Sequence, residues 1–297
     1  MIMIKSGLSY CLALLILLFV GCSDEDTPSF SPSQSEAEVV SQFVQADQAF
    51  SQVFISMSQI GLNPNTDENG VRATATRANE CFSWIFEAKE GLLTIGFDYG
   101  EGCEDEAGNF RSGSVSATLE GETGKFGAMT IRLDQYALND TVLNGTMRGS
   151  IEVDNNGNAF LRGTIQDGRY QLSNDQFITL DFDRVFLWKA GKDTPAEYGD
   201  DEFEVSGNGS FVSTFEGKEF AYAYDTTVPL AYKNACLGAG FPFFSEGLLS
   251  LEFSNIGSTQ ANNTISIDYG DGNCDADVFV TLNDDSFMLD LRALWFL

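Results

Sequence analysis

Histidine is absent from the 297 residues of this chain. Without it there can be no Ser-His-Asp or Cys-His catalytic pair, no histidine-ligated zinc and no histidine-ligated haem. Basic residues are also scarce, since 16 Lys and Arg face 44 Asp and Glu and leave a formal charge of −28. Phosphate backbones would repel such a chain, so we expect no nucleic acid among its partners.

Aromatic residues, by contrast, are plentiful, with 25 Phe, 9 Tyr and 3 Trp. A chain of this composition has enough apolar material to build a core, which distinguishes it from disordered acidic tails. We therefore expect a folded protein with a strongly acidic surface.

The first residues are typical of an export signal. Lys5 precedes sixteen uncharged residues, and the apolar centre of that run, positions 8–20, spans thirteen. The centre is too short to cross a hydrocarbon core of about 30 Å comfortably as a helix, but it suits a signal peptide. Residues 1–21 are therefore predicted to be a cleaved signal peptide.

Gly21 and Cys22 resemble the end of a bacterial lipobox, in which the Cys becomes the lipidated first residue of the mature chain. Residues 22–34 then read as the lipidated Cys and an acidic tether, rich in charge, Ser and Pro. The acidic run directly after Cys22 resembles the surface-export signal of lipoproteins from Bacteroidota. The resemblance implies a protein anchored by lipid in the outer membrane and exposed at the cell surface. The alternative is a secretory signal cut at another bond, with Cys22 incidental.

A long amphipathic helix is predicted over residues 35–62. Ser35 and Glu38 form a capping-box pattern, apolar residues then recur at helical spacing, and Gly61 and Pro64 supply the stop. We expect the apolar face of this helix to pack on a sheet, with a partner-binding or membrane-lying helix as the alternative.

Beyond residue 80 the period of the apolar residues drops to two, which is typical of strands. Positions 177–186 read as a further strand pair. Five dipeptides predict hairpin turns between the runs: Asn144-Gly145, Asn156-Gly157, Asp167-Gly168, Asn208-Gly209 and Glu216-Gly217. Residues 190–202 lack periodic apolar residues and form the best internal break.

The predicted fold class is therefore mainly β, an antiparallel curved sheet or partly open barrel or sandwich, with one long N-terminal helix packed on it. A first β module is expected over residues 80–189 and a second over 203–297, fused into one domain.

An internal repeat links the two modules. Residues 94–103 read TIGFDYGEGC and residues 264–274 read TISIDYGDGNC, with six of the first nine positions identical. Each copy is preceded by another Cys, at position 81 in the first and 236 in the second. Two copies of a strand, a Gly-rich turn and a Cys pair indicate a duplicated structural unit.

The Asp-Tyr-Gly-x-Gly-(x)-Cys signature, found twice behind a helix and a lipobox, resembles a group of surface-exposed Bacteroidota lipoproteins of unknown function. That resemblance covers most of the mature chain. It implies location and a shared fold, and it supplies no catalytic residues.

Four Cys remain outside the signal and the anchor, and an even number in an exported chain favours disulfides. Because duplication should keep pairing inside each copy, we predict Cys81 with Cys103 and Cys236 with Cys274. A redox pair or a metal thiolate site is the alternative, but no C-x-x-C spacing supports it.

The turns of both signatures are acidic. In the second copy Asp271, Asn273, Asp275 and Asp277 place oxygen ligands at alternate positions, as a hard cation such as Ca²⁺ requires. The pattern departs from an EF-hand, and Asp residues that cap their own turns explain the same sequence. We weigh turn chemistry above a calcium site and expect no other cofactor.

Three functions of different classes fit these features. The first is a non-catalytic surface lipoprotein, structural or binding a glycan or protein through its sheet or loops. The second is a carrier of an apolar ligand held between the curved sheet and the helix. The third is a carboxylate-based glycoside hydrolase. We favour the first because no nucleophile and base are paired in the sequence.

Overall fold

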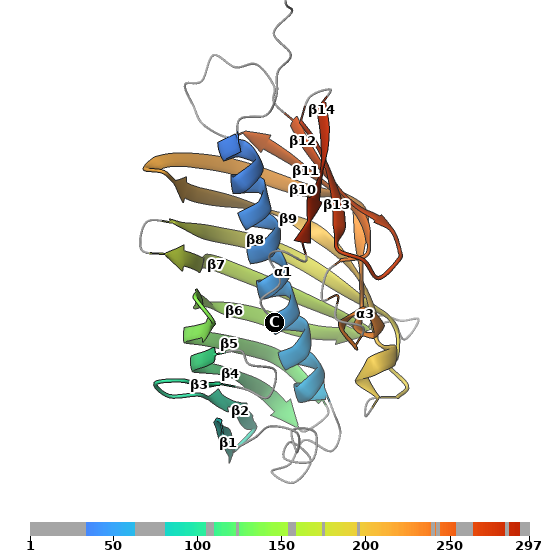
Figure 1. The fold of residues 1–297 in the computed structure, drawn as a ribbon. Coiled ribbons are helices and arrows are strands. Elements are labelled where there is room, and N and C mark those ends of the chain that lie inside the picture. The colour runs from blue at the N-terminus through green and yellow to red at the C-terminus, as the bar shows by residue number, and fades with distance from the viewer. Residues whose placement is uncertain are drawn as a thin grey trace, which may run out of the picture. The chain divides into compact units, whose positions relative to one another are not determined.

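In the described residues, one long helix, two short helices and fourteen antiparallel strands make up the fold (Figure 1). The computed structural model describes residues 34–62, 81–104, 110–122, 125–153, 159–173, 176–194, 197–238, 241, 244–253, 264–282 and 285–291. Every described residue belongs to one compact unit, residues 32–297.

The helices are α1 (Gln34–Leu62), η1 (Tyr198–Asp200) and α3 (Asn234–Gly238). The first strands are β1 (Ser83–Lys89), β2 (Leu92–Asp98), β3 (Cys103–Glu104), β4 (Phe110–Glu122), β5 (Lys125–Leu138), β6 (Thr141–Val153) and β7 (Ala159–Ser173). The later strands are β8 (Gln176–Ala190), β9 (Glu202–Phe215), β10 (Lys218–Lys233), β11 (Glu246–Phe253), β12 (Thr264–Asp271), β13 (Asp277–Leu282) and β14 (Asp285–Asp290).

The strands follow one another across a single open, curved sheet. Each pairs antiparallel with its neighbour in the chain, except that β2 pairs β4 and the short β3 pairs β4 from the side. Strand β8 of the first predicted module pairs with β9 of the second. The predicted break at residues 190–202 therefore lies in a connection between two strands of the same sheet. The predicted fold class, an antiparallel curved sheet with one packed N-terminal helix, is confirmed.

Helix α1 lies across the sheet, as Figure 1 shows. Its Phe43 ring stacks on Phe211 of β9 at 4.2 Å between centroids, and Phe54 stacks on Phe186 of β8 at 4.9 Å. Close approach is possible because Gly149 of β6 and Gly163 of β7 pair under Phe54, where any Cβ would lie under 3.0 Å from the ring. The helix is thus seated directly on the sheet.

Two predictions about the strands are wrong. Positions 177–186 belong to the single strand β8 instead of a strand pair. Asn144-Gly145 and Asp167-Gly168 lie inside strands at register shifts, and Asn208-Gly209 lies inside β9, so these dipeptides do not end strands. Residues with positive φ occur at some β-bulges as well as in hairpin turns, and Asp167 has φ 54° and Gly145 φ 146°.

Glu216-Gly217 does form the predicted turn, between β9 and β10, whereas Asn156-Gly157 lies outside the described residues. In the described part of the chain, no helix is both long enough and apolar enough to cross a membrane.

Candidate functional site

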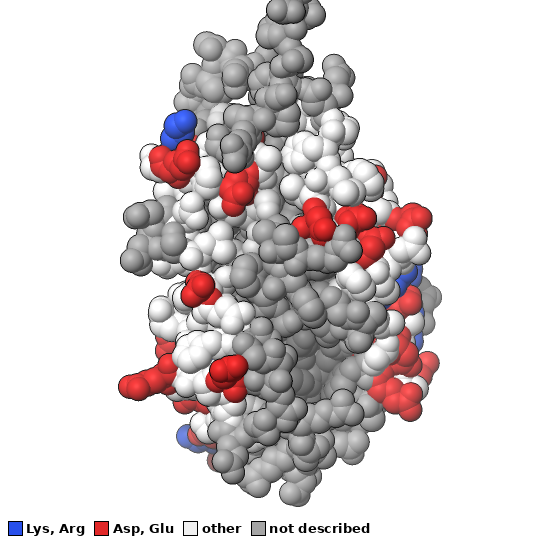
Figure 2. All heavy atoms as spheres, viewed as in Figure 1, with Lys and Arg blue, Asp and Glu red and all other residues white. Residues whose placement is uncertain are grey.

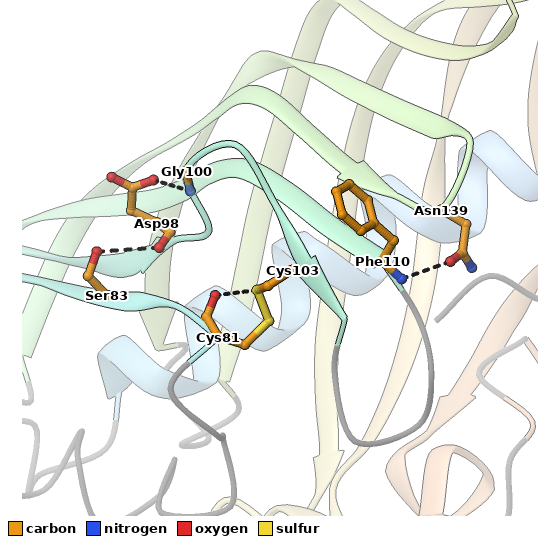
Figure 3. The surroundings of a disulfide bond; sticks show 7 residues. All are labelled: Cys81, Ser83, Asp98, Gly100, Cys103, Phe110 and Asn139. Atoms are coloured by element: carbon orange, nitrogen blue, oxygen red, sulfur yellow. Dashed lines mark hydrogen bonds between the residues drawn. A yellow bond between two sulfur atoms is a disulfide. The ribbon is translucent and has the colours of Figure 1, made fainter.

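The two signature copies keep the disulfides predicted from the repeat. Cys81 pairs with Cys103 and Cys236 with Cys274, with Cα–Cα distances of 5.6 and 5.0 Å. Figure 3 shows the first disulfide beside the signature turn that follows β2. The predicted pairing inside each copy is confirmed.

Both signature turns use the same hydrogen bond. Asp98 Oδ1 accepts from the Gly100 amide at 2.8 Å (Figure 3), and Asp268 Oδ1 accepts from the Gly270 amide at 2.9 Å. The two glycines have φ 56° and 95°, which a residue with a Cβ rarely adopts. Each Asp therefore caps its own turn, in agreement with the turn chemistry expected from the sequence.

The tyrosines of the two copies differ in burial. Tyr269 is 1% exposed and packs edge-on against Phe244 at 5.5 Å. Its counterpart Tyr99 is half-buried at the margin of the core, 5.5 Å from Phe82. The duplication therefore conserves the turn more closely than the side-chain surroundings.

The acidic loop after β12 is largely exposed. Asn273 Nδ2 donates to Asp271 Oδ1 at 2.6 Å, and the Asp277 amide donates to Asp275 Oδ1 at 3.2 Å. Lys233 donates to the Gly272 carbonyl at 2.7 Å, which puts a cation at this loop. Within the described residues, no group of three or more Cys, Asp or Glu is placed to hold a metal ion. Calcium binding here stays a prediction, and the predicted lipidation site Cys22 lies outside the described residues.

The outer face of the C-terminal strands carries a row of four apolar side chains and one Asp that the sequence did not reveal. Cross-strand register places five side chains side by side on β10 to β14: Val228, Leu248, Asp268, Phe279 and Met288. We call these five the outward row. Val228, Phe279 and Met288 are 42%, 49% and 55% exposed, which makes them three of the most exposed large apolar side chains described.

The two flanks of the outward row differ in charge. On one side the next outward positions are Glu246, Asp271, Asp277 and Asp290. On the other side they are Asp225, Ser250, Ser266, Thr281 and Ser286. Figure 2 presents the side of the sheet that carries α1, and there too Asp and Glu outnumber Lys and Arg among the described residues. The row therefore combines exposed apolar side chains with a carboxylate at its centre and an acidic flank.

Beneath α1 lies a buried polar layer that sequence reasoning also missed. Arg184 of β8 is fully buried, with its Nη2 2.8 Å from Asp47 Oδ1 and its Nη1 3.0 Å from Ser51 Oγ. Neither Asp47 oxygen has a well-aligned donor among the described residues, so the contact with Arg184 is an ion pair. A sequence signal existed, because Asp47 is the only charged residue between Glu38 and the end of α1.

Burial raises the pKa of the Asp47 carboxyl above its ordinary range, and the Arg184 charge opposes that rise. For Arg184 burial alone would lower the pKa, but the Asp47 carboxylate beside it reverses the direction and keeps the guanidinium charged. The pair is a structural contact between α1 and β8, and it reaches no described surface.

A second buried carboxylate, Asp201, joins three elements. Its Oδ1 accepts from Trp188 Nε1 at 2.9 Å, its Oδ2 accepts from Gln59 of α1, and its carbonyl accepts from the Asn234 amide at 2.9 Å. Burial raises the pKa of Asp201 to about 6, against the two side-chain hydrogen bonds, which lower it.

The raised pKa of Asp201 should make the free energy of unfolding depend on pH. Since its pKa is about 6 in the fold and about 3.9 in an unfolded chain, its contribution is fully present below pH ~4 and lost as pH rises through 6. We expect the free energy of unfolding to fall from pH 4 to 6 more steeply in the wild type than in Asp201→Asn. Urea unfolding at each pH measures this, with exposed Asp193→Asn as control; equal slopes in wild type and Asp201→Asn would contradict it.

Comparison with known proteins gives no relative for this chain: no family model, no curated protein and no solved structure matches it. Its function must therefore be argued from its own residues.

Proposed function

We propose that this chain is a non-catalytic, lipid-anchored protein of the outer membrane that binds a partner through the outward row. The observation that carries the proposal is the row itself, with Phe279 and Met288 about half exposed and aligned across β13 and β14. Exposing aligned apolar side chains is costly unless they are covered part of the time, and such patches mark interaction sites.

The lipid anchor supports the same function from the sequence. A lipid on Cys22 followed by an acidic tether would hold residues 34–297 beside the membrane without embedding them. The packing of α1 also favours binding by the outer face over the carrier alternative, because Phe43 and Phe54 stack directly on the sheet where an apolar ligand would have to lie.

Two measurements on the full chain test the proposal in the cells that make it. A photo-crosslinking residue replaces Met288 in one variant and Leu92 of β2, which is 44% exposed, in a matched control. We expect a defined adduct from position 288 and none from position 92. Cys22→Ser should move the protein from the membrane fraction to the soluble fraction. Equal adducts at both positions, or unchanged fractionation, would contradict the binding face or the anchor respectively.

A further inference from the structure

We infer that the partner of the outward row is a protein segment that combines apolar side chains with Lys or Arg. This inference rests on the function proposed above and adds the chemistry of the partner.

The dimensions of the row fit an extended protein segment. Its five side chains stand on five adjacent strands, and strands lie about 4.8 Å apart, so the row extends over roughly 19 Å. That length spans about six residues of extended chain, at roughly 3.3 Å per residue. Alternate side chains of such a segment would face the row.

The charges around the row select a cationic partner. The outward carboxylates of β10 to β14 are Glu219, Asp225, Glu246, Glu252, Asp268, Asp271, Asp277 and Asp290. Lys233 is the one basic residue among the described outward positions of β10 to β14. Its ammonium already donates a hydrogen bond to the Gly272 carbonyl. Basic side chains beside apolar ones would be attracted by these carboxylates, whereas acidic side chains would be repelled.

The same features weigh against other partners. Val228, Leu248 and Met288 are aliphatic and offer no flat ring for a sugar, which leaves Phe279 as the one aromatic ring of the row. A membrane with anionic headgroups would be repelled by the flanking carboxylates. A second copy would bring another chain of formal charge −28 to the same face.

Synthetic peptides test the inference with the full chain. Three labelled nine-residue probes repeat Lys-Lys-Val-Val, Glu-Glu-Val-Val and Lys-Lys-Ser-Ser, so that each face of the extended chain carries both residue types. We call them the Lys-Val, Glu-Val and Lys-Ser peptides, and fluorescence anisotropy measures their affinity in 50 and 500 mM salt. We expect the Lys-Val peptide to bind at least tenfold more tightly than either other peptide, and more weakly at high salt.

Two variants locate the binding. Phe279→Ser should weaken the Lys-Val peptide at least tenfold, while Leu92→Ser, an equally exposed apolar residue at the other end of the sheet, should leave it unchanged. Circular dichroism and thermal unfolding establish that both variants fold.

Several results would overturn the inference. One is that the Glu-Val peptide binds as tightly as the Lys-Val peptide. Another is that Phe279→Ser and Leu92→Ser weaken binding of the Lys-Val peptide equally. A third is that oligosaccharides or anionic vesicles, and not the Lys-Val peptide, bind at the row. If position 288 crosslinks in cells and the Lys-Val peptide does not bind, the proposed function stands and the cationic partner is wrong. If position 288 does not crosslink, the proposed function itself fails.

Discussion

Replacing Arg184 by Met is expected to lower the free energy of unfolding by about 3–5 kcal/mol at neutral pH. Arg184 and Asp47 are both fully buried and 2.8 Å apart, so the substitution leaves the Asp47 carboxylate without its counter-charge. The methionine fills much of the space of the arginine stem, which keeps the cost of a cavity small. Urea unfolding followed by circular dichroism measures the loss.

The loss of stability in Arg184→Met should depend on pH, because the Asp47 carboxyl can take up a proton. Burial already raises the pKa of that carboxyl against the opposing charge of Arg184, so removing Arg184 raises it further. A carboxyl with a raised pKa in the fold stabilises most below its unfolded pKa of about 3.9 and loses that contribution as pH rises. We therefore expect the deficit of Arg184→Met to shrink on acidification from pH 7 towards pH 4.

A double-mutant cycle separates the charge from the packing. Asp47→Leu alone leaves a buried guanidinium that cannot lose its proton, and it should cost at least as much as Arg184→Met. The double variant removes both charges, so its loss should be well below the sum of the two.

The matched control lies on the same strand. Lys189 of β8 pairs with Glu204 at 3.0 Å, but their side chains are 50% and 39% exposed. Lys189→Met should therefore cost no more than about 1 kcal/mol. A similar loss for Arg184→Met and Lys189→Met would show that burial adds nothing to the inner pair.

Local features of this fold were predictable because their causes lie close together in the sequence. The capping residues and the apolar spacing predicted a helix over 35–62, and the structure has α1 at Gln34–Leu62. The Cys pairing was predictable because the repeat carried one pair in each copy. Asn144-Gly145 and Asp167-Gly168 misled because residues with positive φ occur at some bulges inside strands as well as in hairpin turns.

The outward row and the buried ion pair depend on contacts between distant residues. Ser51 and Arg184 are 133 positions apart, and nothing in either neighbourhood specifies the other. Arg184 nevertheless stands in phase with buried Phe182 and Phe186 on β8, and that inward position was a readable sign of a buried cation. The row needs the register of five strands, which one residue of slip in any of them would destroy.

Removing the Cys236–Cys274 disulfide by a double substitution to Ala is expected to cost about 4 kcal/mol, because the bond closes a separation of 38 residues. The Cys81–Cys103 bond closes 22 and should cost about 3 kcal/mol when removed in the same way. Denaturant unfolding of both double variants under oxidising conditions measures the two losses. A loss below 1 kcal/mol in either would mean that its loop is already held by other contacts.

The position of the Cys236–Cys274 disulfide predicts which strands should open more readily when the bond is removed. Cys236 lies in α3, 1% exposed, beside Asn234, whose amide bonds the Asp201 carbonyl. Cys274 follows the loop that Lys233 holds through the Gly272 carbonyl. The bond thus fastens the last hairpins to the rest of the sheet. Hydrogen exchange in the double variant should therefore speed up in β11 to β14 well before β4 to β7, and the Lys-Val peptide should bind more weakly. Uniform acceleration across the sheet would mean that these strands unfold with the whole domain and that the disulfide does not hold the outward row.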